Sequence, residues 1–304
     1  MIATETHMTT MNNRERTVFT RRDILKLAGL GAGGLLLRPT SVPASGEVDT
    51  GNAAAMLYDA TRCVGCRACE VACKEWNKLP PDAEPPTDLT AHNFTLIKQH
   101  QESPAGSFRK YQCMHCVHPA CVSACPVQAL EKHDNGPVVY DAEKCIGCRY
   151  CMVACPFQIP RIDWSKALPV IAKCTFCADR IADDRIPACA EACPVQALTF
   201  GTREQILEEA RDRIARHPGR YLAHIYGETE AGGTSWMYLS AIPFEKLGLP
   251  ELDSEPVPEL SEDVAIYGTP SMLVSVAALL GGIYWVTARR AQHTPPCDDS
   301  GKEV

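Results

Sequence analysis

The chain has 304 residues, of which 22% are charged and 45% apolar, so most of it is expected to fold. Its formal net charge of −7 leaves no basic excess of the kind that binds nucleic acid. The unusual feature is the number of cysteines, 17, which indicates either a disulfide framework or a large set of metal ligands.

The N-terminal segment carries a twin-arginine sequence, TRRDILK at 20–26, followed by the uncharged stretch LAGLGAGGLLL at 27–37. This pattern resembles a Tat export signal, with Ile24 where phenylalanine is commonest. Small residues before and at Ala44 suit cleavage by signal peptidase. Residues 1–44 are therefore predicted to be a signal peptide; a pair of arginines before a buried helix is the alternative.

Sixteen of the cysteines fall into four motifs along the chain. The first and third motifs have the spacing C-x2-C-x2-C-x3-C, the second C-x2-C-x4-C-x3-C and the fourth C-x2-C-x11-C-x3-C. The members of the four motifs, in order, are Cys63, Cys66, Cys69 and Cys73; Cys113, Cys116, Cys121 and Cys125; Cys145, Cys148, Cys151 and Cys155; and Cys174, Cys177, Cys189 and Cys193. The seventeenth, Cys297, lies near the C-terminus.

An internal repeat is visible in the hexapeptide CPVQAL, which occurs at 125–130 and again at 193–198. Proline follows the last cysteine in three motifs, and Lys74 takes that place in the first. Asn135-Gly136, between the second and third motifs, is a strong turn signal and predicts a β-hairpin. Each CPVQAL copy is expected to lead into a strand, the second at 197–201.

The segments outside the motifs have simpler patterns. Residues 80–90 are predicted to be a loop insertion, and 203–216 a surface-packed helix because apolar residues recur on one face. Residues 221–240 are predicted to form two strands around a Gly-Gly turn, acting either as a partner contact or as a plain structural element. Residues 248–263 are rich in proline and acidic residues and are predicted to be an extended linker.

Residues 264–288 contain no charge, and about 20 apolar residues suffice to cross a bilayer. Tyr284 and Trp285 suit the membrane interface, and Arg289 and Arg290 follow at once. Because positive residues flank the cytoplasmic side, we expect the tail 289–304 in the cytoplasm and residues 45–263 on the opposite face. A buried core helix is the alternative.

The spacing of the cysteines favours iron–sulfur clusters. A C-x2-C-x2-C loop lets three thiolates surround one cubane and aims backbone N–H groups at the sulfurs. The fourth cysteine points away to a second cluster, as in bacterial two-cluster ferredoxins. The alternatives are a disulfide framework, zinc sites, for which the fourth motif alone would serve, or a mixture of zinc and iron. Tat export favours iron, because that route carries proteins already folded around a cofactor.

Residues 56–245 resemble the four-cluster ferredoxin subunits of membrane-bound respiratory complexes, such as the beta subunits of formate dehydrogenase, polysulfide reductase and DMSO reductase. The resemblance implies an α+β fold of two pseudo-symmetric bacterial 2[4Fe–4S] ferredoxin-like modules, followed by one C-terminal transmembrane helix. The first and fourth motifs pair in this family, so the first module would comprise 45–104 and 166–247, and the second 105–165.

The same resemblance implies four [4Fe–4S] clusters, since no ligand position is missing. The four implied ligand sets are, first, Cys63, Cys66, Cys69 and Cys193; second, Cys174, Cys177, Cys189 and Cys73; third, Cys113, Cys116, Cys121 and Cys155; and fourth, Cys145, Cys148, Cys151 and Cys125. The first motif departs from the pattern by having Lys74 instead of proline after Cys73, which leaves ligation intact.

The sequence contains no nucleophile or acid–base pair, so no catalytic residue is predicted. The resemblance implies an electron relay between a catalytic subunit and a quinone-reactive membrane subunit. It also implies a single-pass protein of the inner membrane with its main domain in the periplasm. The Tat signal combined with a membrane helix, and the stretches 57–77 and 224–240, favour the iron–sulfur subunit of hydrogenase-2-type enzymes with a NiFe partner. The first alternative is a beta subunit of formate dehydrogenase or of another molybdopterin enzyme. The second alternative is a non-redox zinc or disulfide scaffold.

Charged residues beside the cysteine loops are candidates for tuning cluster potentials. Arg67, Arg149, Lys144 and Lys173 are cationic and would favour the more negative reduced state; ordinary solvated charges are the alternative. His115 lies between two cysteines of the second motif and is predicted to be a hydrogen-bonding neighbour rather than a ligand.

Overall fold

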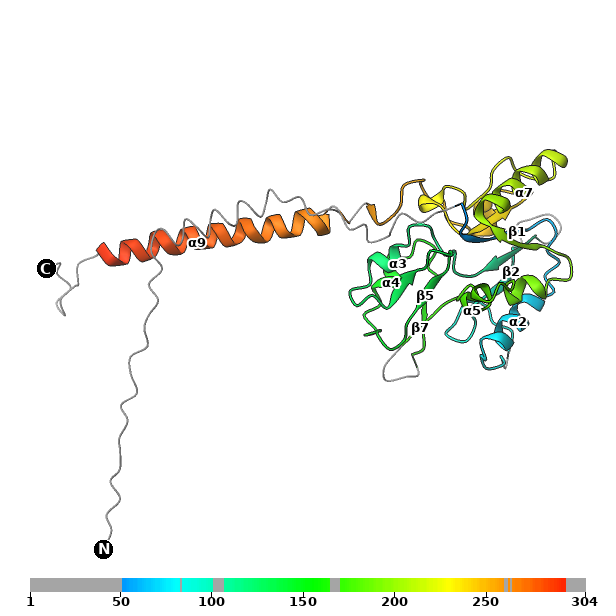
Figure 1. The fold of residues 1–304 in the computed structure, drawn as a ribbon, viewed down its shortest axis with the longest axis horizontal. Coiled ribbons are helices and arrows are strands. Elements are labelled where there is room, and N and C mark those ends of the chain that lie inside the picture. Colours follow the sequence, from blue (N-terminus) through cyan, green and yellow to red (C-terminus); the bar gives the residue numbers. More distant parts are fainter. Residues whose placement is uncertain are drawn as a thin grey trace, which may run out of the picture. The chain divides into compact units, whose positions relative to one another are not determined.

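The computed structural model describes residues 51–82, 84–100, 107–164, 170–259, 262 and 264–293. Within these ranges short helices alternate with short strands, and one long helix follows near the C-terminus (Figure 1). The predicted α+β mixture is therefore present. The predicted signal peptide at 1–44 and Cys297 lie outside the described residues.

The described strands form one three-stranded sheet and three two-stranded ones. The larger sheet has the order β8-β1-β9, with β8 antiparallel and β9 parallel to β1. The small sheets are the antiparallel pairs β2–β3, β4–β5 and β6–β7. The strands are β1 Ala54–Asp59, β2 Leu96–His100, β3 Ser107–Tyr111, β4 Leu130–Lys132, β5 Val138–Tyr140, β6 Arg161–Ile162, β7 Ile171–Ala172, β8 Leu198–Thr202 and β9 Trp236–Leu239.

The helices around the cysteine motifs are short. Each of α3, α4 and α6 ends just before the last cysteine of its motif, whereas α2 continues past Cys73 to Trp76. Lys74 in place of proline keeps the N–H that the continuing helix needs. The helices are α2 Ala68–Trp76, α3 Ala120–Ser123, α4 Tyr150–Ala154, α5 Ala178–Ala182, α6 Ala188–Glu191, α7 Arg203–Arg216 and α9 Thr269–His293, with 3-10 turns η1 Glu230–Gly232 and η2 Phe244–Leu247 and the π-helical turn η3 Val264–Gly268.

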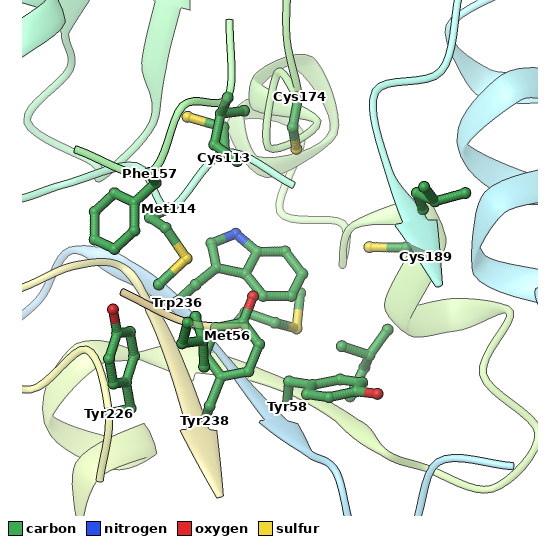
Figure 2. Close-up of a cluster of buried hydrophobic side chains, with 14 of the residues drawn as sticks. Met56, Tyr58, Cys113, Met114, Phe157, Cys174, Cys189, Tyr226, Trp236 and Tyr238 are labelled. Atoms are coloured by element: carbon green, nitrogen blue, oxygen red, sulfur yellow. The ribbon is translucent and has the colours of Figure 1, made fainter. Parts of the chain in front are cut away.

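The central strand β1 is buried on both faces, and its alternating side chains enter two different cores. Leu57 packs with Ile206 and Ala210 of α7, so this helix covers one face of the sheet. Met56 and Tyr58 enter a larger core that also contains buried cysteines (Figure 2). The sheet thus separates an ordinary apolar core from the core that holds the metal-ligand candidates.

Helix α7 confirms the helix predicted at 203–216. Thr202 begins it with a capping box, in which the Thr202 side chain accepts from Gln205 N–H and the Gln205 side chain accepts from Thr202 N–H. Such a cap fixes the point at which β8 turns into the helix.

The two CPVQAL copies adopt the same local structure. Gln128 and Gln196 both have positive φ angles, 51° and 49°, and their N–H groups bond back to the carbonyls of Cys125 and Cys193. Strands β4 and β8 begin two residues later. The repeat therefore encodes a tight turn after the last cysteine of the motif and the start of a strand, as expected.

The hairpin predicted around Asn135-Gly136 is present as β4–β5, and its turn contacts the central sheet. Ala54 N–H donates to Asn135 O at 2.9 Å, which joins the second-motif region to β1. Gly136 has φ +114°, and a Cβ at this position would lie 2.7 Å from Ala54 O. Only glycine fits this close backbone approach.

We expect Gly136→Ala to lower thermal stability much more than Gly219→Ala. Both glycines have positive φ, which costs alanine about 1–2 kcal/mol, but a Cβ at Gly219 meets nothing within 4 Å. The additional loss in Gly136→Ala reports the contact with β1. The midpoint of the far-UV circular dichroism melt measures it, and equal midpoints in the two variants would contradict this role.

The two-strand prediction for 221–240 is wrong in its first half. Strand β9 is present, but the preceding residues contribute only an isolated bridge, Tyr226 to Tyr238. The turn η1 lies between them, and Gly232 and Gly233 have positive φ angles of 79° and 90°. Strand β9 instead pairs in parallel with β1, so β1 takes the place of the first strand of the predicted hairpin.

Helix α9 overlaps the predicted membrane segment but begins at Thr269, after η3. Its stretch Thr269–Arg290 has a mean hydropathy of 1.7 and is long enough to cross a bilayer. Leu273, Leu279 and Leu280 are among its exposed apolar side chains. The described part of the chain does not bury this helix, and an apolar helix left uncovered in this way suits a lipid environment, which agrees with the predicted membrane anchor.

Candidate metal centre

All sixteen cysteines of the four motifs are free thiols. Most are buried or half-buried, and Cys66 is exposed. Within the described residues, no three His, Cys, Asp or Glu side chains gather closely enough to hold a single metal ion. The thiols are nevertheless grouped, and the groups mix cysteines from different motifs.

The second ligand set implied by the resemblance lines one cavity. Cys174, Cys177 and Cys189 of the fourth motif line it together with Cys73 of the first. Burial raises the pKa of Cys73 to about 12, and Cys189 and Cys177 add to the rise. The contact between α2 and α6 brings the two motifs to this place.

The third set shows the same crossing of motifs. Burial raises the pKa of Cys116, and the next largest contributions come from Cys155, Cys113 and Cys121. Cys155 belongs to the third motif, whereas the other three belong to the second. These four thiols therefore lie close enough to interact electrostatically.

The fourth set is gathered around Cys151. Burial raises the pKa of this thiol to about 11, and Cys125, Cys145 and Cys148 raise it further. Cys125 comes from the second motif, so the second and third motifs each place their last cysteine near the thiols of the other motif.

For the first set the described contacts concern Cys69, Cys63 and Cys193 singly. Burial raises the pKa of Cys69 to about 12, with Cys63 among the contributors. Cys193 is half-buried, and its sulfur accepts from Ala197 N–H at 3.3 Å. The association of Cys66 and Cys193 with Cys69 and Cys63 stays a prediction.

Neighbouring sets also lie beside one another. Cys69 of the first set is influenced by Cys189 of the second, and Cys174 of the second by Cys113 of the third. Cys121 of the third set is influenced by Cys151 of the fourth. Each of these pairs joins a thiol of one implied set to a thiol of the next.

Backbone N–H groups point at the cysteine sulfurs, as the motif spacing predicts. The shortest such contact described is from Ala129 N–H to Cys125 at 3.2 Å, and Phe176 N–H donates to Cys174 at 3.3 Å. In the first and third motifs, Arg67 and Arg149 begin the following helices with φ angles of 60° and 69°. The same left-handed turn therefore precedes the helix in both motifs.

Two buried lysines contribute positive charge to the thiol core. Lys173, predicted from the sequence, is 5% exposed, and its Nζ donates to the carbonyls of Val138 and Cys174 at 2.6 and 3.1 Å. Lys110, which sequence reasoning missed, is 1% exposed and lies in β3 among the cysteines of two sets. The signal that could have revealed it is a lysine inside a short strand three residues before a cysteine motif.

The other predicted cations differ from Lys173. Lys144 is exposed and pairs with Asp141 at 3.4 Å, as the solvated-charge alternative proposes. The guanidinium of Arg149 lies over the Trp164 ring, 4.3 Å from its centre. A third cation that sequence reasoning missed, Lys132, is half-buried near Cys116 and Cys113, and burial lowers its pKa to about 8.

His115 is a fully buried core residue. Its Nδ1 accepts from Val138 N–H at 2.9 Å, and its ring stacks on Phe176. Cys113, Cys174 and Cys189 lie around the indole of Trp236 (Figure 2). In the described part of the chain, Trp236 Nε1 has no hydrogen-bond partner. Buried polar groups of this kind are expected to have a partner, so this core fits an additional group that accepts hydrogen bonds.

Free thiols in mixed groups, N–H groups aimed at sulfur and an unpaired buried donor together fit 4Fe–4S clusters. Comparison with known proteins agrees, because residues 105–203 match the family described as 4Fe-4S dicluster domain. A protein of Nitratidesulfovibrio vulgaris is 42% identical over 89% of this chain and 77% of its own length. The hydrogenase-2 operon protein HybA of Escherichia coli O157:H7 is 35% identical over 86% of this chain and 93% of its own length.

The chain belongs to the HybA family of iron–sulfur proteins. This HybA-family protein is also 39% identical to the iron–sulfur subunit of the nitrate-inducible formate dehydrogenase of Escherichia coli K12, over 61% of the chain and 67% of that subunit. The similarity to the formate dehydrogenase subunit is therefore strong but covers less of both chains. The predicted resemblance to respiratory iron–sulfur subunits is confirmed.

Proposed function

We propose that this HybA-family protein relays single electrons through four [4Fe–4S] clusters held by the four ligand sets given above. When bound, such clusters accept and release one electron at a time. The observation that supports the proposal is that each implied set has a thiol close enough to interact with a thiol of the next: Cys69 with Cys189, Cys174 with Cys113, and Cys121 with Cys151. A scaffold needs no such row, whereas electron transfer needs short steps between carriers.

The chain's own residues hold and insulate the carriers. Burial of Cys69, Cys174 and Cys189 excludes water, and the N–H groups of Phe176 and Ala129 stabilise negative sulfur. Phe176 of the fourth motif stacks on His115 of the second motif and packs against Trp236, which supports contact between the second and third sets at these rings. No residue is required to move a proton, so the protein itself performs no catalytic step.

The partners in this proposal are a periplasmic catalytic subunit and a quinone-reactive integral membrane subunit. A NiFe hydrogenase is favoured as the catalytic partner because the similarity to HybA extends over 93% of that protein. A formate dehydrogenase or another molybdopterin enzyme is the second candidate, supported by the 39% identity to the formate dehydrogenase subunit.

The proposed topology is single-pass in the inner membrane, with the iron–sulfur part in the periplasm. Helix α9 supports the anchor, and Arg289 and Arg290 at its C-terminal end support a cytoplasmic tail. The Tat signal predicted at 1–44 is consistent with the same orientation.

Two measurements on anaerobically purified protein test the proposal. Four clusters predict about 16 irons and 16 acid-labile sulfides per chain; zinc sites or disulfides predict neither. Co-purification with a nickel-containing enzyme would support a hydrogenase as the catalytic partner. Co-purification with a molybdenum- or tungsten-containing enzyme would instead support a formate dehydrogenase or another molybdopterin enzyme. Colourless protein without iron would overturn the relay.

A further inference from the structure

Lys110 is a positive charge enclosed in the core. Its side chain is fully buried, its Nζ donates to Thr95 Oγ1, and it lies 4.9 Å from the centre of the Trp236 ring. It forms no ion pair with a carboxylate within the part of the chain that the structure describes. A buried ammonium group without a counter-charge is strongly unfavourable, so the core must supply negative charge.

Lys110 lines the cavity formed by the second set, together with Cys73, Cys174 and Cys189. Cys69 of the first set lies in α2 beside Glu70, whose side chain binds Ile97, the residue paired with Lys110 across β2 and β3. Clusters held by the thiolates of these cysteines would supply the negative charge that the ammonium group lacks.

An acidic side chain near Lys110 is already engaged elsewhere. Burial raises the pKa of Glu70, and Lys110 is among the charges that oppose the rise. However, Glu70 Oε1 accepts a hydrogen bond from Ile97 N–H at 2.6 Å. Ile97 is the residue paired with Lys110 across β2 and β3, so Glu70 binds the strand next to the one that carries the lysine and does not pair with its ammonium group.

We propose that Lys110 is a fixed counter-ion shared by the clusters of the first and second sets, and that it raises both of their reduction potentials together. This inference rests on the proposed function. Reduction adds one negative charge to a cluster, so a cation held beside two clusters stabilises the reduced form of each. Thr95 and Trp236 act as the positioning groups that hold the ammonium between them.

The charge comes from an unexpected part of the chain. Strand β3 lies within 105–165, the range predicted to form the second module, yet its Lys110 serves cysteines of the first and fourth motifs. The potentials of the first two clusters therefore depend on the docking of β3 against them. Lys110 is a positioning residue for electron transfer and touches no substrate.

The test is a redox titration of the complete, cluster-loaded protein followed by EPR. Lys110→Met keeps the length of the side chain and removes its charge. We expect two of the four cluster signals to become harder to reduce, with at least a tenfold lower ratio of reduced to oxidised cluster at a fixed potential, equal to about 59 mV for one electron. The other two signals should stay unchanged, and Lys110→Arg should restore the original potentials.

Lys98→Met is the matched control, because Lys98 lies on the neighbouring strand β2 but is solvent-accessible and pairs with Asp88 at 3.0 Å. It should shift no signal. A shift of only one signal in Lys110→Met, or of none, would overturn the inference.

If Lys110→Met binds fewer clusters than the unmodified protein, the identity of the lost clusters still tests the inference. Loss confined to the first two clusters, with rescue by arginine, supports the counter-ion, whereas equal loss of all clusters in both variants rejects it. Absence of iron and sulfide from the unmodified protein would instead reject the proposed function. Normal iron content with unmoved potentials rejects only the role of Lys110.

Discussion

Replacing Cys73 with alanine is expected to abolish the cluster of the fourth motif and to spare the cluster of the motif that contains Cys73. The reason is that Cys73 lines the same cavity as Cys174, Cys177 and Cys189. A [4Fe–4S] cluster is held by four thiolates, so removing one either prevents assembly or leaves a cluster with three irons. The iron content should fall by about one to four per chain, and one [4Fe–4S] EPR signal of the reduced protein should disappear.

Two further variants identify which cluster is lost. Cys177→Ala should remove the same EPR signal as Cys73→Ala, because both thiols are assigned to the second set. Cys66→Ala, in the same motif as Cys73, should remove a different one. If Cys73→Ala and Cys66→Ala erase the same signal, the crossing of motifs is wrong. Cys297→Ala, outside the four motifs, should keep the full iron content.

Introducing two arginines at the centre of α9 is expected to release the protein from the membrane. Leu279 and Leu280 lie in the middle of Thr269–Arg290 and are 64% and 59% exposed. Each arginine at the centre of a membrane helix costs about 2.5–3.5 kcal/mol, so the pair costs roughly 5–7 kcal/mol. The double variant Leu279→Arg, Leu280→Arg should therefore move to the soluble fraction with its iron content intact.

The anchor experiment requires expression without partner subunits, since these could retain the protein at the membrane by themselves. Fractionation after an alkaline wash measures the distribution. The matched control is Leu279→Ala with Leu280→Ala, which shortens the same side chains without adding charge and should stay in the membrane. Membrane retention of the arginine variant under these conditions would show that α9 does not anchor the chain.

Local sequence patterns predicted the local structures well. The apolar periodicity at 203–216 correctly predicted α7, which begins after the cap at Thr202. Such a prediction works because the buried face of a helix is visible in the spacing of apolar residues a few positions apart. Asn135-Gly136 became the turn between β4 and β5, because a tight turn depends on the residues in it. The repeated CPVQAL string became the same turn and strand start twice.

Long-range partners were harder to predict. Residues 221–240 have the composition of a hairpin, yet β9 pairs in parallel with β1, about 180 residues earlier in the chain. The alternating pattern shows that a strand will form but not which strand will accept its hydrogen bonds. Lys110 was missed for a related reason, since its sequence neighbours do not reveal the thiols that surround it in space.

The sequence by itself determined the ligand chemistry, because cysteine spacing of two and three residues is a local property that shapes a loop around a metal cluster. It also determined the apolar helix, which depends only on composition and length. Tertiary structure decided that thiols of the first and fourth motifs line one cavity and that Lys110 is buried beside them. Those relations depend on how distant segments pack, since burial and electrostatic contact are set by neighbours in space rather than along the chain.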